Sequence, residues 1–312
     1  MKVLALAGGV GGAKLAAGLQ SVLAPEDLTV VVNTADDFRL WGLHISPDLD
    51  TVMYTLAGIA NPQTGWGIQD ETFDALEMLG RYGEDTWFTL GDRDLATHVL
   101  RTARLYNGEP LTEITGKLAT SLGVRASVLP MCDEPVSTRV HTPDGPLDFQ
   151  NYFVRRHQED EVLGVDLRGI GEARVSTAVS EALAEAEAII FCPSNPIVSI
   201  GSILAVPGVT EALTTTSAPK VAVSPIVGGR ALKGPADRMM DSLGHEVSAT
   251  GVARIYEGIV DGMVIDRADT VEEDGIMDLG MEVLITDAVM RDEVDRGRLA
   301  REILEFAAAL GA

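Results

Sequence analysis

The first 33 residues constrain the fold most strongly, because they contain a strand–helix–strand pattern. The apolar run KVLALA (2–7) predicts a strand that is buried on both faces. A glycine-rich loop, GGVGG (8–12), follows, and apolar residues recur with helical spacing over 13–24, where Pro25 ends the helix. The run LTVVVN (28–33) predicts a second strand. Two buried strands joined by a helix indicate a parallel sheet with a right-handed crossover.

The same alternation returns in the second half of the chain. Further buried strands are predicted at 186–192, 219–224, 262–266 and 281–286, and a helix at 294–310 closes the sequence. Before them, a strand is predicted at 125–130, followed by a hairpin in which PDGP joins STRVHT to LDFQNYFV.

The intervening segment is different, because it contains helical patterns and no convincing strand. These patterns cover 51–60, 70–83, 94–108 and 111–123. The sequence therefore predicts an α/β protein with a Rossmann-like, mostly parallel sheet and a small inserted helical domain. The core comprises residues 1–50 and 124–312, and the insertion comprises residues 51–123.

Composition excludes several classes of partner. The chain has 47 acidic and 24 basic residues, and its net charge of −23 repels nucleic acid and anionic membrane surfaces. The apolar start breaks at Gly8 and Gly9, too early for a secretory signal. Cys132 and Cys192 are far apart and form no CxxC pair, which fits a reducing compartment. We expect a cytoplasmic protein.

The glycine loop is the first candidate site. Gly9, Gly11 and Gly12 permit close approach of a ligand, and the next helix offers free N–H groups to a phosphate. Neither standard motif is present: Lys14 stands where GxGxxG needs its last glycine, and Leu15 stands where a P-loop needs Ser or Thr. A plain tight turn is the alternative to phosphate binding.

Acidic residues follow the second predicted strand. Asp36 and Asp37 are placed to bind ribose hydroxyls, to hold Mg²⁺ beside a phosphate, or to form a solvated turn. In SPDLDT (46–51), Asp48 and Asp50 fit the first turn of a helix, a structural role that is compatible with ligand binding. Spacing alone does not choose among these alternatives.

Three other segments have chemistry suited to anions. In TLGDRD (89–94), Asp92 could cap a helix, Arg93 suits a bidentate phosphate contact, and His98 is expected to be structural. Two loops that follow buried strands, PSNP (193–196) and SPIVGGRALKG (224–234), provide hydroxyl, amide, backbone and cationic donors: Ser194, Asn195, Ser224, Gly228, Gly229, Arg230 and Lys233.

No nucleophile motif such as GxSxG is present in the sequence. Chemistry at these loops would depend on positioning, a metal ion and general-base help. That combination suits phosphoryl transfer, in which alignment and charge neutralisation are the protein's main tasks.

The segments GGVGGAKL, VVNTADD, SPDLDTVMYTL, GDRDLATH, LPMCDEPVSTRV, PSNPIVSIGSIL and SAPKVAVSPIVGGRALKGPA occur in this order over about four-fifths of the chain. Together they closely resemble the 2-phospho-L-lactate transferase family, called CofD or, in actinobacteria, FbiA. This resemblance implies a transferase of coenzyme F-420 biosynthesis. Such an enzyme moves a 2-phospholactate or phosphoenolpyruvate group from a guanosine-diphosphate-linked donor to the terminal ribityl hydroxyl of the deazaflavin Fo, and GMP leaves.

The resemblance also implies roles for particular residues. Asp50 and Thr89 match positions assigned to Fo binding, and Asp92 and Trp41 are added as candidate Fo contacts. Mg²⁺ is the implied cofactor, with ligands among Asp36, Asp37, Asp48 and Asp50, and a homodimer is expected. Candidate catalytic residues are Asp50, Asp37 and Arg93. The glycine loop with Lys14, the PSNP loop and the SPIVGG loop would hold the guanosine diphosphate.

Two other functions are alternatives to this transferase. A related family binds UDP-sugars and regulates metabolism without catalysis, and it shares the glycine loop; the PDLDT segment favours the transferase. A nicotinamide-dependent oxidoreductase is disfavoured by the broken GxGxxG. The identity of the donor, whether phospholactate, phosphoenolpyruvate or phosphoglycerate, depends on a few atoms in one pocket and is left open.

Overall fold

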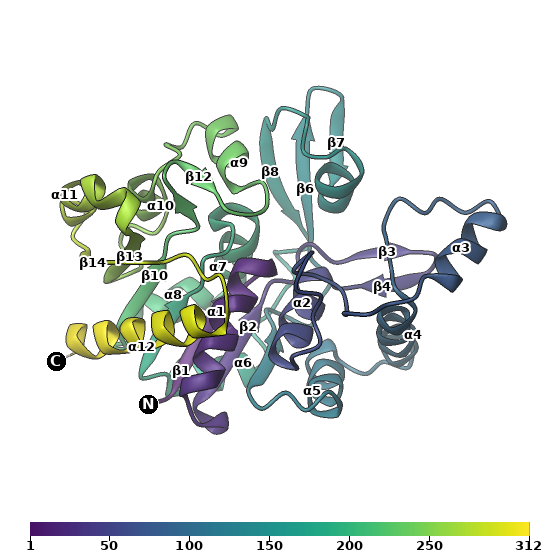
Figure 1. Ribbon diagram of the computed structural model, residues 1–312, viewed down its shortest axis with the longest axis horizontal. Helices are drawn as coiled ribbons and strands as arrows, with labels where there is room; N and C mark the ends of the chain where they lie inside the picture. The colour runs from purple at the N-terminus through teal and green to yellow at the C-terminus, as the bar shows by residue number, and fades with distance from the viewer. Residues whose placement is uncertain (312) are drawn as a thin grey trace.

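A seven-stranded parallel sheet organises the chain, as a computed structural model describes it for residues 1–311 (Figure 1). The strand order is β14-β13-β10-β9-β1-β2-β5, and every neighbouring pair is parallel. This confirms the predicted α/β fold. The strands are β1 (Val3–Ala7), β2 (Leu28–Val32), β5 (Ser127–Pro130), β9 (Ala188–Phe191), β10 (Lys220–Val223), β13 (Gly262–Asp266) and β14 (Glu282–Thr286).

Both faces of this sheet are buried, because helices cover each of them. Along β1, Val3 and Ala5 belong to one apolar cluster and Leu4 and Leu6 to the other, as the two-residue period of a strand requires. The first face is covered by α1 (Gly9–Val22), α2 (Pro47–Leu56), α5 (Leu111–Ser121) and α12 (Glu293–Leu310). The second is covered by α6 (Thr177–Glu185), α7 (Gly201–Ala205), α8 (Val209–Thr215), α10 (Ala249–Ile255) and α11 (Glu273–Met277).

Four helices lie between β2 and β5 in the sequence, where helical patterns were predicted: α2, α3 (Asp74–Arg81), α4 (Asp92–Tyr106) and α5. A short hairpin, β3 (Phe38–Leu40) and β4 (Leu43–Ile45), precedes them and was not predicted. Its two-residue turn needs positive φ at both positions, and Trp41 and Gly42 have φ of 50° and 80°. A tryptophan does not predict such a turn, because residues other than Gly, Asn and Asp rarely adopt positive φ.

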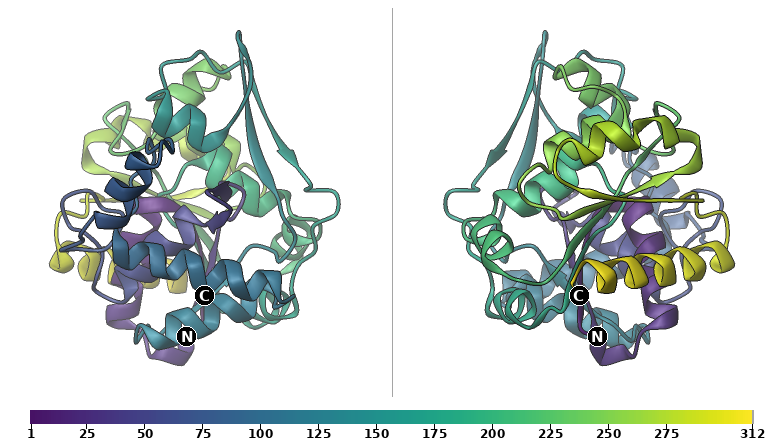
Figure 2. Two further views of the ribbon diagram at one scale, coloured as in Figure 1. Left: turned by 90° about the vertical axis from the view of Figure 1, so that its right-hand side faces the viewer. Right: turned by 90° about the vertical axis from the view of Figure 1, so that its left-hand side faces the viewer.

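A small antiparallel sheet, β6 (Ser137–Thr142), β7 (Gly145–Asp148) and β8 (Gly164–Arg168), projects beyond the main sheet (Figure 2). The predicted hairpin is present, but its second strand ends at Asp148. The following residues form a π-helical turn, η2 (Asn151–Arg155), instead of the expected continuation of the strand. This turn allows Phe149 and Tyr152 to pack in one cluster with Val140 and Val162.

The remaining elements are short. They are η1 (Pro25–Asp27), η3 (Pro196–Ile200), η4 (Arg267–Glu272), α9 (Ala236–Ser242) and the hairpin of β11 (Ile226–Val227) with β12 (Arg230–Ala231). Cys132 and Cys192 are buried and free. Within residues 1–311, no single helix is long and apolar enough to cross a membrane; only a bent pair, Pro196–Ala205 with Val209–Thr215, has the required length and composition.

Candidate functional site

A large cavity lies where the order of the strands reverses. From β1 the chain proceeds outward to β2 and β5, and later to β9, β10 and beyond on the other side of β1. The loops after β1 and β9 therefore separate at the carboxyl edge of the sheet, where doubly wound proteins bind ligands. A cavity of about 760 Å³ opens there, large enough for a nucleotide-sized ligand.

The glycine segment is helical rather than a loop, which corrects the expectation for residues 8–12. Helix α1 begins at Gly9, so the glycines form its first turn. A Cβ on Gly11 would lie 2.2 Å from the carbonyl oxygen of Pro193, and one on Gly12 would lie 2.5 Å from Ser194 Oγ. Glycine is required here because the start of α1 presses against the loop after β9.

Ser194 joins these two segments. Its hydroxyl accepts a hydrogen bond from the Gly8 amide at 3.0 Å and donates one to the Gly8 carbonyl at 2.7 Å. Asn195, the other polar residue of this loop, caps η3 by accepting hydrogen bonds from Ile197 and Val198. Both residues line the cavity, but their side chains are already engaged in shaping it.

Two carboxylates lie side by side at the start of α1. Asn33 Nδ2 donates to Asp36 Oδ2 at 3.0 Å and to Asp48 Oδ2 at 2.9 Å, and both aspartates line the cavity. Burial raises the pKa of Asp48 to about 6. Burial and the neighbouring Asp48 raise the pKa of Asp36 well above its ordinary value. Asp36 Oδ1 is buried and makes no hydrogen bond of normal geometry. A cation bound next to both carboxylates, on the side that faces the cavity, would be favoured by their negative charge.

Asp50 is held in a buried ion pair. Arg101 of α4 donates to both of its oxygens, with Nη1 3.0 Å from Oδ2 and Nη2 bonded to Oδ1. Arg101 is fully buried, and the charge of Asp50 raises the pKa of its guanidinium against the effect of burial. Because both oxygens of Asp50 bind the guanidinium, this carboxylate contacts the cavity as half of an ion pair rather than as a free acid.

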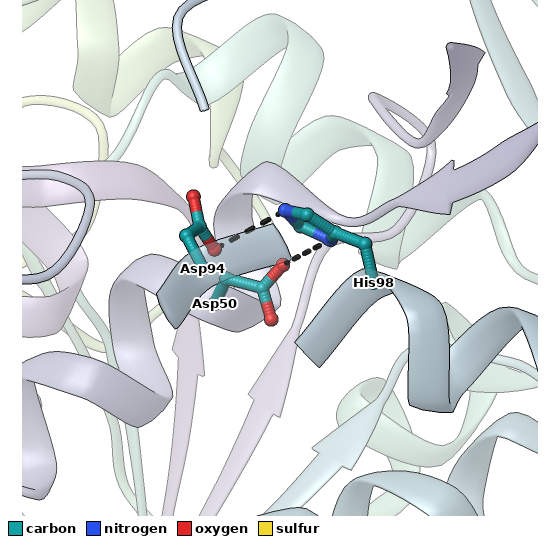
Figure 3. Close-up of side chains that lie close together, drawn as sticks. All are labelled: Asp50, Asp94 and His98. Atoms are coloured by element: carbon teal, nitrogen blue, oxygen red, sulfur yellow. Dashed lines mark ion pairs between the residues drawn. The ribbon is translucent and has the colours of Figure 1, made fainter. Parts of the chain in front are cut away.

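Next to this pair, His98 and Asp94 form a second polar contact (Figure 3). Arg101 Nη1 lies 3.2 Å from His98 Nδ1, and a guanidinium can only donate, so Nδ1 accepts and the ring proton is on Nε2. Nε2 lies 3.1 Å from Asp94 Oδ1 without the geometry of a hydrogen bond, and Asp94 Oδ1 accepts a hydrogen bond from the Tyr54 hydroxyl at 2.8 Å.

Two groups in the described residues could therefore hold a metal ion. Ligand atoms of Asp50, Asp94 and His98 lie within 4.8 Å of one another. Arg101 already neutralises Asp50, however, and a second cation beside a buried guanidinium would be repelled. Asp36 and Asp48 have no basic partner, offer only oxygen and include an orphaned atom, which fits the preference of Mg²⁺.

Positive charge gathers elsewhere along the same cavity. Lys14, Lys233 and Arg291 all line it. Burial lowers the pKa of Lys14, and the charges of Arg296 and Lys233 lower it further. Lys14 Nζ donates to the Met290 carbonyl at 3.0 Å, and Lys233 Nζ donates to the Thr64 carbonyl at 2.8 Å. The cavity is thus lined by cations as well as by carboxylates.

Two segments that line the cavity are connected to each other. Phe88 and Thr89, between α3 and α4, belong to one, and Phe153 of η2 belongs to the other. Arg155 connects the segments: its guanidinium pairs with Asp85 at 2.8 Å and lies 5.9 Å from the centre of the Trp87 ring.

The predicted site residues are distributed unevenly over this structure. The cavity lining includes Gly9, Gly11, Lys14, Asp36, Asp48, Asp50, Thr89, Ser194, Asn195 and Ser224. Other predicted residues lie outside the lining and have other contacts. Asp37 accepts hydrogen bonds from His44 and Ser46, Trp41 forms the hairpin turn, and Gly12 packs against Ser194.

Two further predicted residues belong to a helix start rather than to the cavity. Asp92 accepts hydrogen bonds from Thr72 and from the amides of Asp74 and Ala75, so it fixes the beginning of α3. Arg93 reaches the Gln69 carbonyl at 3.4 Å and lines a separate, smaller cavity.

The SPIVGG segment also differs from the expected phosphate loop. Gly228 and Gly229 have φ of 59° and 73° and form the two-residue turn of the β11–β12 hairpin. Arg230 is exposed in this hairpin and lies outside the cavity lining. The cation of this segment that lines the cavity is Lys233, three residues later.

Sequence reasoning missed Tyr54, Asp94 and Arg101 as members of the site. A signal was present in the helical spacing. Asp94, His98 and Arg101 recur at intervals of four and three residues, which places them on one face of α4, and Asp50 and Tyr54 are four apart on α2. The sequence pattern does not show that this face of α2 packs against this face of α4.

The doubly wound sheet and the cavity at its switch point define an α/β protein of the class that binds nucleotides and phosphates. Residues 3–294 match the family described as 2-phospho-L-lactate transferase CofD. The chain belongs to this family, as the resemblance of its motifs predicted.

Relatives along the whole length agree. The chain is 42% identical to the 2-phospho-L-lactate transferase of Methanosarcina acetivorans, over 99% of this chain and 98% of that one. It is 41% identical to the phosphoenolpyruvate transferase of Streptomyces griseus, over 98% of both chains. Among solved structures, a Bacillus halodurans protein of the UPF0052 family has a similar fold, with a TM-score of 0.64 and 18% identity over 97% of this chain and 98% of that one.

Proposed function

We propose that this protein transfers a 2-phospholactate or phosphoenolpyruvate group from its guanosine-diphosphate-linked donor to the terminal ribityl hydroxyl of the deazaflavin Fo and releases GMP. Membership of the CofD family, with full-length relatives named for both transferase activities, supports the reaction class. The single structural observation that carries the proposal is the switch-point cavity, which is lined by cations as well as by carboxylates.

Each set of charges suits one part of this reaction. Lys14, Lys233 and Arg291 would neutralise the diphosphate of the donor. Asp36 and Asp48 would hold Mg²⁺, which as a Lewis acid withdraws charge from phosphate oxygens when it is bound. Aromatic residues of the lining, including Phe88 and Phe153, offer flat apolar surface to the deazaflavin ring.

The proposed site retains part of the set predicted from the sequence. Asp50 and Thr89 remain candidate Fo contacts because both line the cavity. Lys233 is retained and Arg291 is added, whereas Asp37, Trp41, Asp92, Arg93 and Arg230 are assigned no contact with substrate in this proposal. The protein is proposed to act as a homodimer in the cytoplasm, and light scattering coupled to gel filtration would measure its mass.

The test is an assay of GMP release. The protein is incubated with Fo, Mg²⁺ and, in turn, the phospholactate, phosphoenolpyruvate and phosphoglycerate donors. The donors must be compared directly, because the relatives carry two different activity names at similar identity and these names do not identify the donor of this chain. GMP release that requires both Fo and one donor is the expected result. No turnover with any donor, together with tight binding of a UDP-sugar, would instead favour the noncatalytic alternative.

A further inference from the structure

Phosphoryl transfer to an alcohol releases a proton, and the cavity offers several carboxylates that could accept it. Asp50 is poorly suited, because Arg101 binds both of its oxygens. Asp36 and Asp48 are the residues proposed above to hold the metal ion. Asp37 lies outside the cavity lining and accepts hydrogen bonds from His44 and Ser46. These assignments leave one further acid of the lining, Asp94.

The two oxygens of Asp94 have different surroundings. Oδ1 faces the Tyr54 hydroxyl and His98 Nε2, at 2.8 and 3.1 Å. Oδ2 makes no hydrogen bond to any residue of the described chain, and it is not among the fully buried atoms that lack a partner. Figure 3 shows one oxygen directed at the imidazole ring and the other turned away from it. Asp94 is therefore fixed through one oxygen and free at the other.

The imidazole is itself fixed. Because Arg101 donates to Nδ1, the proton of His98 is on Nε2, which lies 3.1 Å from Asp94 Oδ1 in close contact rather than in an aligned hydrogen bond. His98 is 1% exposed and Arg101 is fully buried, so packing holds both in place. Tyr54, His98 and Arg101 thus form a rigid support behind a single cavity-facing carboxylate, the arrangement expected of an oriented general base.

We infer that Asp94 is the general base of the transfer, an inference that rests on the proposed function. As the oxygen of the acceptor's terminal hydroxyl forms its bond to the phosphorus of the donor, the hydroxyl proton moves to Asp94 Oδ2. The bond between that phosphorus and the bridging oxygen of the diphosphate breaks, and GMP leaves with the bonding electron pair. Asp94 then releases its proton to water. Tyr54 and His98 are positioning residues, since they act through Asp94.

The experiment compares Asp94→Asn with the wild-type chain, using whichever donor the wild type turns over. Loss of a general base typically lowers kcat about 100- to 10,000-fold, and we expect the KM for the donor to stay unchanged. The matched control is Asp74→Asn, an exposed acid in the first turn of α3, which should keep wild-type kcat. In Asp94→Gly, added formate should restore part of the lost rate, which a merely structural carboxylate would not explain.

Tyr54→Phe provides a second, milder variant. It keeps the ring and removes only the hydrogen bond to Asp94, so kcat should fall about 3- to 10-fold with an unchanged KM for the donor. An Asp94→Asn protein that keeps more than about one-tenth of wild-type kcat would overturn the inference. So would a folded Asp94→Gly protein that formate does not rescue. If both Asp94 variants fail to fold, Tyr54→Phe decides, and an unchanged kcat refutes the inference.

The wild-type measurement distinguishes a failure of the proposed transferase function from a failure of the role assigned to Asp94. A wild-type chain without turnover on any donor would overturn the proposed function, and the assignment of Asp94 with it. Turnover by both the wild type and Asp94→Asn would overturn only the assignment of Asp94.

Discussion

Charge pairing between single residues divides the aspartates of the site into different roles. Asp50 is neutralised by Arg101, whereas Asp36 and Asp48 share only the neutral amide of Asn33. The sequence presents all of them alike, as acids near the ends of a strand and the start of a helix. Their partners decide what each can do, and the most important partner, Arg101, is 51 residues away from Asp50.

Removing Arg101 should destabilise the fold. Arg101→Ala leaves the buried Asp50 carboxylate without a partner, a change that costs about 3–5 kcal/mol. The free energy of unfolding, measured by urea denaturation, would show this loss. The double variant Asp50→Leu/Arg101→Met removes both charges and should recover most of the stability, because no buried charge is left unpaired. An Arg101→Ala protein within about 1 kcal/mol of wild type would show that water solvates Asp50 instead.

Asp48 should couple metal binding to pH. Its pKa is raised to about 6, so between its unfolded value and about 6 the folded state retains a proton that the unfolded state loses. Stability of the metal-free protein should therefore fall as pH rises through this window. Mg²⁺ competes with the proton, so it should raise Tm more at pH 7.5 than at pH 5. Asp48→Asn is the control, and an equal Mg²⁺ effect at both pH values would contradict the assignment.

At the scale of the element, apolar patterning predicted most of the sheet. The run at 262–266 coincides with β13, and the closing helix predicted at 294–310 differs from α12 by one residue. These elements are predictable because burial on a sheet face imposes its own period. The β3–β4 hairpin, the helical glycine turn and the π-helical turn were missed. Each is set within a tertiary context that the sequence pattern does not show: Gly11, for example, must be glycine because Pro193 leaves no room for a side chain.

Two glycine-to-alanine variants test this explanation. Gly11→Ala places a Cβ 2.2 Å from a backbone carbonyl, so α1 and the loop after β9 must separate. We expect a loss of about 1–3 kcal/mol and weaker nucleotide binding. Gly116→Ala is the matched control in the interior of α5, where a Cβ meets no atom within 4 Å. It should stabilise the protein by about 0.5–1 kcal/mol. Equal effects of the two substitutions on Tm would refute the packing argument.

For the molecule as a whole, a ligand in the cavity should contact both the N-terminal and the C-terminal half of the chain and so stabilise them together. The lining draws on residues from Gly8 to Arg291, so GDP with Mg²⁺ should stabilise the entire fold. At a ligand concentration of 100 times Kd the expected gain is about 2.7 kcal/mol, which calorimetry would detect as a higher Tm. Asp48→Asn should reduce the gain. No shift of Tm with saturating GDP and Mg²⁺ would argue against nucleotide binding at the switch point.

The hydrogen bonds between Gly8 and Ser194 also have a consequence for synthesis. They join residues 186 positions apart, so the first turn of α1 leaves the ribosome long before the loop that completes it. A contact between distant segments cannot form until both have been synthesised, and synthesis proceeds from the N-terminus. The ligand site therefore cannot be completed until the loop after β9 has emerged. A nascent chain that lacks β9 has a glycine turn without its partner, and it has no pocket in which to hold a substrate.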